Sequence, residues 1–279
     1  MKTRADSMKQ SYQSLYESFD SPLMSQLRLE AYGEDIGQHS WVTAEDLRHD
    51  APRLKLTAAA RLLDLGCGPC GPLTFLMQTT SCSGTGLDSS ADALSVGRRR
   101  AQSLGVDDRL MVCETDLDNG LPVATGTVAA AISLDVILHL RDRLRMFTEI
   151  ARVLMDGGRF LFTDAAVVTG AMSSEEVASR SMHGFTQYCA PGFNERTLEL
   201  AGLALLETED RTHGMWRNAR GRLEARFRHQ TDFEQLEGAE GFARYQDYLQ
   251  TIVSLSQRGA LSRIMYLVEV RSQARAPKN

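Results

Sequence analysis

The feature that most constrains the fold is a short apolar run that ends in closely spaced glycines. Residues 62–65 carry three leucines around Asp64, and Gly66, Gly68 and Gly71 follow. A run of this kind is typical of a strand buried on both faces of a parallel sheet. Glycines directly after the strand permit backbone torsions and a close ligand approach that a Cβ would prevent. The next helix would present its free N–H groups to an anion, so the run predicts a strand, a ligand-binding turn and a helix.

Acidic residues close the next two predicted strands as well. The apolar run over residues 82–87 ends at Asp88, and the strand predicted over residues 109–113 is followed by Asp116. Because the carboxyl ends of parallel strands meet at one edge of a sheet, these carboxylates and that of Asp64 are expected to share that edge. There Asp64 can face an amine, Asp88 can accept two hydrogen bonds from a ribose diol, and Asp116 can face an adenine amino group. The pattern indicates a nucleoside-like cofactor.

Two classes of cofactor fit this pattern. The three glycines match G-x-G-x-x-G, the fingerprint of dinucleotide-binding proteins, which also expects an acid about 20 residues later. A nicotinamide-dependent dehydrogenase or epimerase is therefore one alternative. A protein that binds an adenosyl ligand without catalysing a reaction is another. The acids at Asp64 and Asp116 favour a cofactor other than a dinucleotide.

The run from Asp64 to Gly71 resembles the first motif of class I S-adenosylmethionine-dependent methyltransferases of the small-molecule, type 11 kind, in which a hydrophobic strand ends in D-x-G-x-G-x-G. Residues 128–140 resemble the fourth strand of that family and the loop after it. Residues 149–159 resemble its R-x-L-x-P-G-G turn, with Asp156 where proline is usual. The resemblance covers residues 61–164 well and residues 194–210 and 262–270 more loosely.

From Arg61 onward, predicted strands and helices alternate, which indicates right-handed crossovers and a parallel sheet. Together with the resemblance, this predicts an α/β fold with a Rossmann-like, seven-stranded, mostly parallel sheet whose last strand is antiparallel. The predicted strands cover residues 61–66, 83–88, 109–113, 128–134, 158–164, 203–210 and 263–270.

The remaining segments are expected to cover the sheet edge where the ligand binds. Residues 1–56 are predicted to form a helical N-terminal lid, and residues 57–279 the methyltransferase core. Within the core, residues 166–193 and 212–261 are too long for simple connections and are predicted to be helical cap insertions. The second insertion carries an amphipathic stripe at helical spacing. Its members are Phe242, Tyr245, Leu249, Ile252 and Val253.

The resemblance implies S-adenosylmethionine as the cofactor and transfer of its methyl group to a small-molecule acceptor by in-line displacement. In related methyltransferases the segment before the first strand folds over the ligands, and here that segment is rich in polar and aromatic side chains. The residues expected to bind the cofactor are Gln38, Ser40, Trp41, Asp64, Gly66, Cys67, Gly68, Asp88, Asp116, Leu117 and Leu134.

Methyl transfer from a sulfonium needs alignment and, where the acceptor carries a proton, a base. His139 follows the fourth strand and is one candidate base; local packing is the alternative role for it. Asp164 ends the fifth strand and is the other catalytic candidate, to orient the acceptor, with a turn cap as its alternative role. His183 and Tyr188, in the first insertion, are weaker candidates. Asn194 is interpreted as a helix N-cap.

Composition excludes several other functions. A net charge of −5 argues against nucleic acid as a partner. No apolar stretch is long enough to span a membrane, and the polar first ten residues show no secretory signal. The five cysteines are scattered, so a metal site at Cys67-x-x-Cys70 is not expected, and reduced thiols favour the cytoplasm. The sequence does not reveal the oligomeric state.

Overall fold

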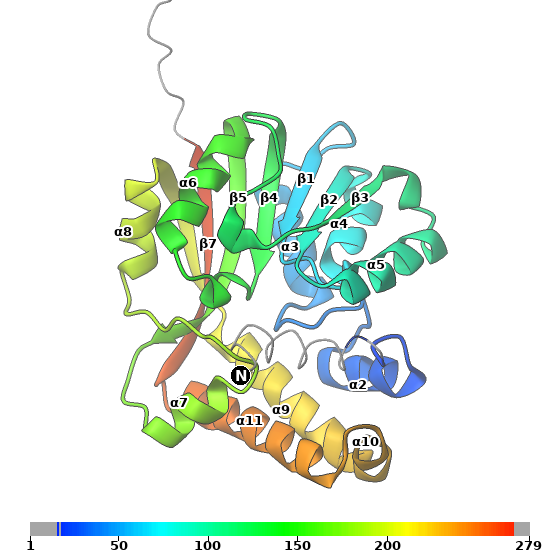
Figure 1. Ribbon diagram of the computed structural model, residues 1–279. Coiled ribbons are helices and arrows are strands. Elements are labelled where there is room, and N and C mark those ends of the chain that lie inside the picture. Colours follow the sequence, from blue (N-terminus) through cyan, green and yellow to red (C-terminus); the bar gives the residue numbers. More distant parts are fainter. Residues whose placement is uncertain (1–15, 17, 271–279) are drawn as a thin grey trace, which may run out of the picture.

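A central mixed sheet organises the molecule. The computed structural model describes residue 16 and residues 18–270, and in this part seven strands pair in the order β3-β2-β1-β4-β5-β7-β6 (Figure 1). The pairs from β3 to β5 are parallel, whereas β7 is antiparallel to both β5 and β6. This confirms the predicted sheet with its antiparallel last strand. The strands are β1 (Arg61–Leu65), β2 (Ser83–Asp88), β3 (Leu110–Glu114), β4 (Val128–Leu134), β5 (Leu154–Val168), β6 (Leu203–Asp210) and β7 (Leu261–Val270).

The predicted start of the fifth strand is wrong, whereas the other strand starts agree within two residues. β5 begins at Leu154, four residues before the expected start. Leu154 pairs with Val128 and Arg159 with Ala130, so residues 155–158 bulge out of the ladder. Gly157 lies in this bulge with φ of +71°. The resemblance implies a turn at Gly157 and Gly158, with the strand starting at residue 158, but both glycines lie in a bulge inside the strand.

Helices cover both faces of the sheet because successive strand residues point to opposite sides. Leu62 of β1 packs with α3, α4 and α5, and its neighbour Leu63 packs with α6 and α8. The second face holds a stack of aromatic rings that includes Phe160, Phe162 and Tyr266. These covering helices are α3 (Ala44–Arg53), α4 (Gly71–Thr80), α5 (Ala91–Ser103), α6 (Arg143–Val153) and α8 (Phe193–Leu200).

A separate group of helices lies beyond the carboxyl ends of β1, β4 and β5 (Figure 1). The predicted stripe of the second insertion is buried there, within apolar clusters that join α9, α11 and α2. α2 and α9 approach closely: a Cβ built on Gly221 would lie 3.0 Å from the Cα of Ala31. The helices of this group are α2 (Pro22–Tyr32), α7 (Ser174–Arg180), α9 (Thr212–Arg228), α10 (Gln230–Glu237) and α11 (Ala239–Gln257).

These helices come from the two predicted insertions and from the predicted N-terminal lid. Of that lid, residues 1–15 and 17 lie outside the described residues. Among the residues that the structure describes, no helix combines the length and the apolar character needed to cross a membrane.

Candidate cofactor and acceptor site

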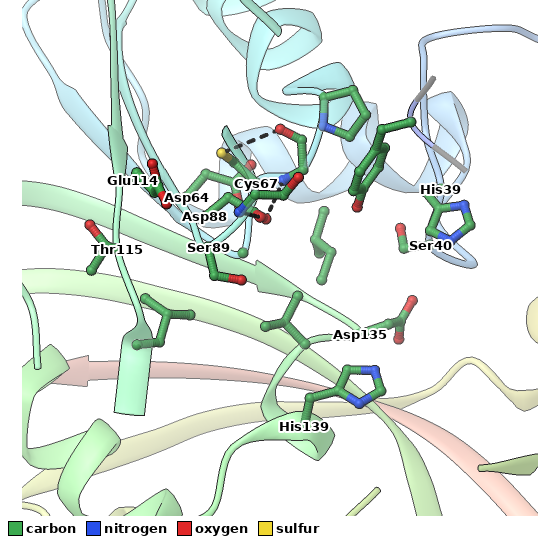
Figure 2. Close-up of a pocket in the computed structure, with 18 of the residues that line it drawn as sticks. His39, Ser40, Asp64, Cys67, Asp88, Ser89, Glu114, Thr115, Asp135 and His139 are labelled. Atoms are coloured by element: carbon green, nitrogen blue, oxygen red, sulfur yellow. Dashed lines mark hydrogen bonds between the residues drawn. The ribbon is translucent and has the colours of Figure 1, made fainter. Parts of the chain in front are cut away.

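A cleft of about 400 Å³ opens at the carboxyl ends of β1, β2 and β4, within the size range of small-molecule sites (Figure 2). Most of the predicted cofactor residues line it, and it also receives side chains from the segment before β1. Among the predicted residues, those that line the cleft are Ser40, Asp64, Gly66, Cys67, Gly68, Asp88, Asp116, Leu117, Leu134 and His139.

The turn after β1 follows the glycine motif. Gly66 and Gly68 have φ of +73° and +50°, which other residues rarely adopt. A Cβ on Gly66 would lie 2.6 Å from the side chain of Val136, so this position has no room for one. A Cβ on Gly68 would meet only the phenol group of Tyr16, with the hydroxyl at 3.4 Å, and both residues line the cleft. The turn therefore keeps its backbone accessible to a ligand.

The third glycine has a different role from the first two. Cys70 occupies the third glycine position of the D-x-G-x-G-x-G motif and has φ of +57°. Gly71 comes one residue later, and a Cβ built on it would lie 2.1 Å from the carbonyl oxygen of Gly37. Gly71 thus allows the segment before β1 to pack directly on the start of α4.

Asp88 is fixed by the glycine turn itself. One carboxylate oxygen accepts the N–H of Gly68 at 2.8 Å, and the other accepts the N–H of Ser90 at 2.9 Å. Burial raises the pKa of Asp88, and these backbone donors act against that rise. The carboxylate therefore has a defined orientation at the wall of the cleft.

Asp64 lies deeper in the same cleft and is 3% exposed. Burial, and to a lesser degree the charge of Asp88, raises the pKa of Asp64 to about 8. Burial thus favours the neutral form of this carboxyl group. A cation bound beside it would favour the charged carboxylate.

The far end of the cleft combines one exposed acid with apolar side chains. Asp116 follows β3 and accepts hydrogen bonds from the N–H of Asp118 and the side chain of Asn119. Leu117, next to Asp116, is almost fully buried and contributes apolar surface there, and Leu134 does the same where β4 ends. The structure therefore brings the three predicted acids to one cleft, in the order of their strands.

The structure separates the three predicted residues of the N-terminal segment. Ser40 lines the cleft, whereas Gln38 does not: its amide bonds to the backbone of Glu34 and Ile36 and shapes the loop. Trp41 lines a second cavity of about 60 Å³, and its backbone N–H donates to the carboxylate of Asp135 at 3.0 Å. Gln38 and Trp41 thus do not line this cleft, although residues next to them in the chain do.

His139 lines both the cleft and the second cavity. Its Nδ1 lies 2.8 Å from the carbonyl oxygen of Phe185. Since a carbonyl only accepts, Nδ1 carries the proton and Nε2 of the neutral ring has the free lone pair. Burial, aided by the charge of Arg180, lowers the pKa of His139 below 6.5, so the ring is neutral at pH 7.

Asp164, the other catalytic candidate, lies outside both cavities and is fully buried. Its carboxylate forms an ion pair with Arg143 of α6 at 2.5 Å and accepts a hydrogen bond from Asn194 at 2.8 Å. Asp164 also accepts the N–H of Ala166, which makes it part of a packed network rather than of the cleft wall. The interpretation of Asn194 as an N-cap is wrong, because α8 begins at Phe193 with Gly192 as its N-cap.

The second cavity adds residues that the sequence did not single out. His183 lines it as well, whereas Tyr188 does not and instead bonds to Ser181. For Tyr245 the sequence signal was the amphipathic stripe of α11, which predicted packing rather than a site. The residues that line the second cavity are His39, Ser40, Trp41, Asp135, Leu138, His139, Arg180, His183, Thr186, Arg222, Tyr245 and Tyr248.

Asp135 connects the two cavities and was also missed. It follows β4 with φ of +61°, and its carboxylate accepts hydrogen bonds from Arg263 at 2.8 Å and Thr163 at 2.8 Å. Arg263 is fully buried, and its charge lowers the pKa of Asp135 despite burial. A non-glycine residue with positive φ directly after a strand is a strained feature typical of functional sites, but the sequence alone does not reveal it.

Comparisons with known proteins agree with this geometry. Residues 63–162 match the family model described as a methyltransferase domain. Methyltransferase GfsG of Streptomyces halstedii is 32% identical over 164 residues, which cover 57% of this chain and 58% of that protein. The chain thus spans less than two thirds of the length of this curated relative.

Two solved structures share the fold. The cyclopropane synthase MmaA2 from Mycobacterium tuberculosis has a TM-score of 0.81 at 15% identity, covering 94% of this chain and 98% of that one. A geranyl diphosphate methyltransferase in complex with SAM has a TM-score of 0.66 at 20% identity, covering 81% of this chain and 85% of that one. These comparisons confirm the resemblance inferred from the glycine motif. Residues 63–162 match a methyltransferase domain, and the sheet around them has a Rossmann-like fold.

Proposed function

We propose that the protein transfers the methyl group of S-adenosylmethionine to a small-molecule acceptor. The observation that carries the proposal is the single cleft that joins the glycine turn, Asp64 and Asp88 to a second cavity at His139. A cofactor in the cleft would thus have an enclosed place for an acceptor beside it. The match to a methyltransferase domain supports the same reaction.

The cofactor site follows from the chemistry of the donors. Asp64 would bind the amino group of the methionine part, and Asp88 would accept both hydroxyls of the ribose. Asp116 would face the adenine amino group, between the apolar surfaces of Leu117 and Leu134. Ser40, Gly66, Cys67 and Gly68 would complete the wall. Gln38 and Trp41 remain in the proposal as residues that hold the N-terminal loop in place.

Bound S-adenosylmethionine supplies an activated methyl group on a sulfonium. The chain would then align the acceptor, exclude water and, where needed, remove a proton. His139 is placed for the last task because its Nε2 lone pair is free when Nδ1 donates to Phe185. Asp164 would act only indirectly, by fixing the network around Arg143.

Methyl transfer is tested with S-adenosylmethionine labelled on its methyl carbon and a panel of neutral, cationic, carboxylated and phosphorylated small molecules. We expect one compound class to acquire the label while S-adenosylhomocysteine forms in equal amount. Tight binding of the cofactor without labelling of any compound would favour the non-catalytic alternative.

Asp88→Ala is expected to weaken binding of S-adenosylhomocysteine by about 1.5–3 kcal/mol, because two hydrogen bonds to a charged group would be lost. Isothermal titration calorimetry measures the change. Asp107→Ala is the matched control, since that acid is exposed on a short helix outside the cleft. An unchanged dissociation constant for a folded Asp88→Ala variant would refute the ribose assignment.

The lowered pKa of His139 predicts a pH profile. A base must be unprotonated, so kcat/KM should fall only as the pH drops through an apparent pKa below 6.5 and stay level above it. His139→Gln should remove this acid limb and lower kcat about 100-fold or more, with little change in affinity for S-adenosylhomocysteine. A variant that keeps the wild-type profile would show that His139 is structural.

We propose that the described part of the N-terminal segment, residues 18–56, and the insertions 166–193 and 212–261 close over the bound ligands. Gly37, His39 and Ser40 line the cleft, and Trp41 is bonded to Asp135 and to Asn218 of α9. Amide hydrogen exchange should therefore show that S-adenosylhomocysteine protects residues 36–41 as well as the glycine turn. Protection confined to residues 64–71 would contradict the lid.

Partner and location are proposed on composition. The net charge of −5 supports a small-molecule acceptor rather than a nucleic acid or a membrane. The scattered cysteines support a cytoplasmic location.

A further inference from the structure

The second cavity holds two buried arginines whose hydrogen-bond partners are uncharged. Arg180 ends α7 and Arg222 lies in α9, and they are 4% and 5% exposed. Arg180 donates to the carbonyl oxygen of Ala165 at 3.1 Å. Arg222 donates to the hydroxyls of Tyr32 and Tyr245 and to the carbonyl oxygen of His39. Within the described residues, no carboxylate oxygen lies within 4.0 Å of either guanidinium.

The acid of the cavity does not neutralise these charges. Asp135 lines the cavity, but its carboxylate is paired with Arg263, which is itself fully buried. Burial, together with the charges of Arg222 and Arg180, lowers the pKa of His183 to about 3, so that ring is neutral at pH 7. The cavity therefore has a positive charge close to two, held in a small buried space.

Aromatic rings hold the two guanidinium groups without neutralising them. Arg222 lies 5.2 Å from the ring centroid of Trp41 and 5.6 Å from that of Tyr245, and Arg180 lies 5.8 Å from that of Tyr248. The Nε of Arg180 is buried and has no hydrogen-bond partner in the described part of the chain. A buried charge with an unused donor is costly unless an anion completes it.

The cavity is continuous with the proposed site of methyl transfer. His39, Ser40, Asp135 and His139 line both the cavity and the cleft. Figure 2 shows these four side chains at one end of the cleft. A ligand with one end in the cavity would thus extend past His139 toward the cleft. The volume of about 60 Å³ suits a single small group rather than a whole molecule.

We propose that the methyl acceptor carries a small anionic group, a carboxylate or a phosphate, that Arg180 and Arg222 bind in this cavity. This proposal rests on the proposed methyl transfer. The guanidinium groups would supply charge-assisted hydrogen bonds, and the Nε of Arg180 would gain its missing acceptor. The anionic end would then fix which atom of the acceptor faces the methyl group.

The chain contains a reporter for this site. It has two tryptophans, Trp41 beside Arg222 and Trp216 elsewhere on α9, so a Trp216→Phe variant leaves Trp41 as the only fluorescent indole. This variant, saturated with S-adenosylhomocysteine, is titrated with sodium acetate, sodium phosphate and neutral acetamide at fixed ionic strength. We expect a saturable fluorescence change with acetate, phosphate or both, and none with acetamide. The anion with the lower dissociation constant distinguishes a carboxylate acceptor from a phosphate acceptor.

Variants of the arginines test the assignment. Arg180→Met and Arg222→Met should each raise the apparent dissociation constant of the anion at least tenfold, whereas Arg217→Met, an exposed position on α9, should leave it unchanged. Because Arg222 contacts Trp41, its loss can change the fluorescence directly, and Arg180→Met then provides the test that leaves the reporter's contact intact. Retained binding of S-adenosylhomocysteine shows that each variant is folded. Anion responses that do not saturate, or that survive both substitutions, would overturn the proposal.

The two proposals fail in different ways. Binding of S-adenosylhomocysteine without any saturable anion response would refute the anionic acceptor and leave methyl transfer intact. A saturable anion response in a protein that does not bind S-adenosylhomocysteine would refute the proposed function instead.

Discussion

Gly66→Val should abolish detectable binding of S-adenosylhomocysteine. A branched side chain would have to adopt φ of +73°, and its Cβ would lie 2.6 Å from the side chain of Val136. The turn would have to move, and the backbone that faces the cleft would move with it. Calorimetry should show at least a 100-fold loss of affinity, which corresponds to about 2.7 kcal/mol.

Gly126→Val is the matched control for this substitution. Gly126 also has positive φ, of +67°, but a Cβ there meets no atom within 4 Å and the residue lies outside the cleft. It should lower stability without changing affinity. Gly68→Ala extends the test, because its Cβ would enter the cleft with little contact to the protein. Wild-type affinity in folded Gly66→Val and Gly68→Ala variants would show that the ligand does not bind at this turn.

Arg143→Met should destabilise the fold by about 3–5 kcal/mol, the usual effect of removing one partner of a buried ion pair. Asp164 is fully buried and would lose the guanidinium that lies 2.5 Å from its carboxylate. Arg143 also donates to Gln187 and Asn194, so the link between α6, α8 and the first insertion would be lost. Urea denaturation measures the free energy of unfolding.

A double variant separates charge from packing. Arg143→Met combined with Asp164→Leu removes both charges and should recover part of the loss, because no carboxylate remains buried alone. A single variant that loses less than about 1 kcal/mol would contradict the structural role given to this pair.

The sequence was sufficient to predict the sheet and most of the cleft. Strand, turn and helix follow each other within a few residues around Gly66, so local signals define them. Asp88 and Asp116 follow because parallel strands end at one edge. The order of these acids along the cleft follows from the order of the strands, so it could be predicted without any long-range side-chain contact.

The remaining parts depend on contacts between distant segments. Arg180 and Arg222 are about 40 residues apart, and only the packing of α7, α9 and α11 over the sheet brings them to one cavity. Asp164 shows the opposite case: the sequence placed this acid at the end of the fifth strand, which is wrong, because β5 continues to Val168, and α6 and α8 enclose the side chain. Gln38 likewise uses its side-chain amide for a hydrogen bond to the backbone of its own loop rather than to a ligand.

The most direct test of the central claim is a calorimetric titration of the purified protein with S-adenosylhomocysteine and, separately, with NAD. The cleft predicts saturable binding of S-adenosylhomocysteine at one site per chain and no heat of binding for NAD. Saturable binding of NAD without binding of S-adenosylhomocysteine would contradict the proposed function and favour the dinucleotide alternative.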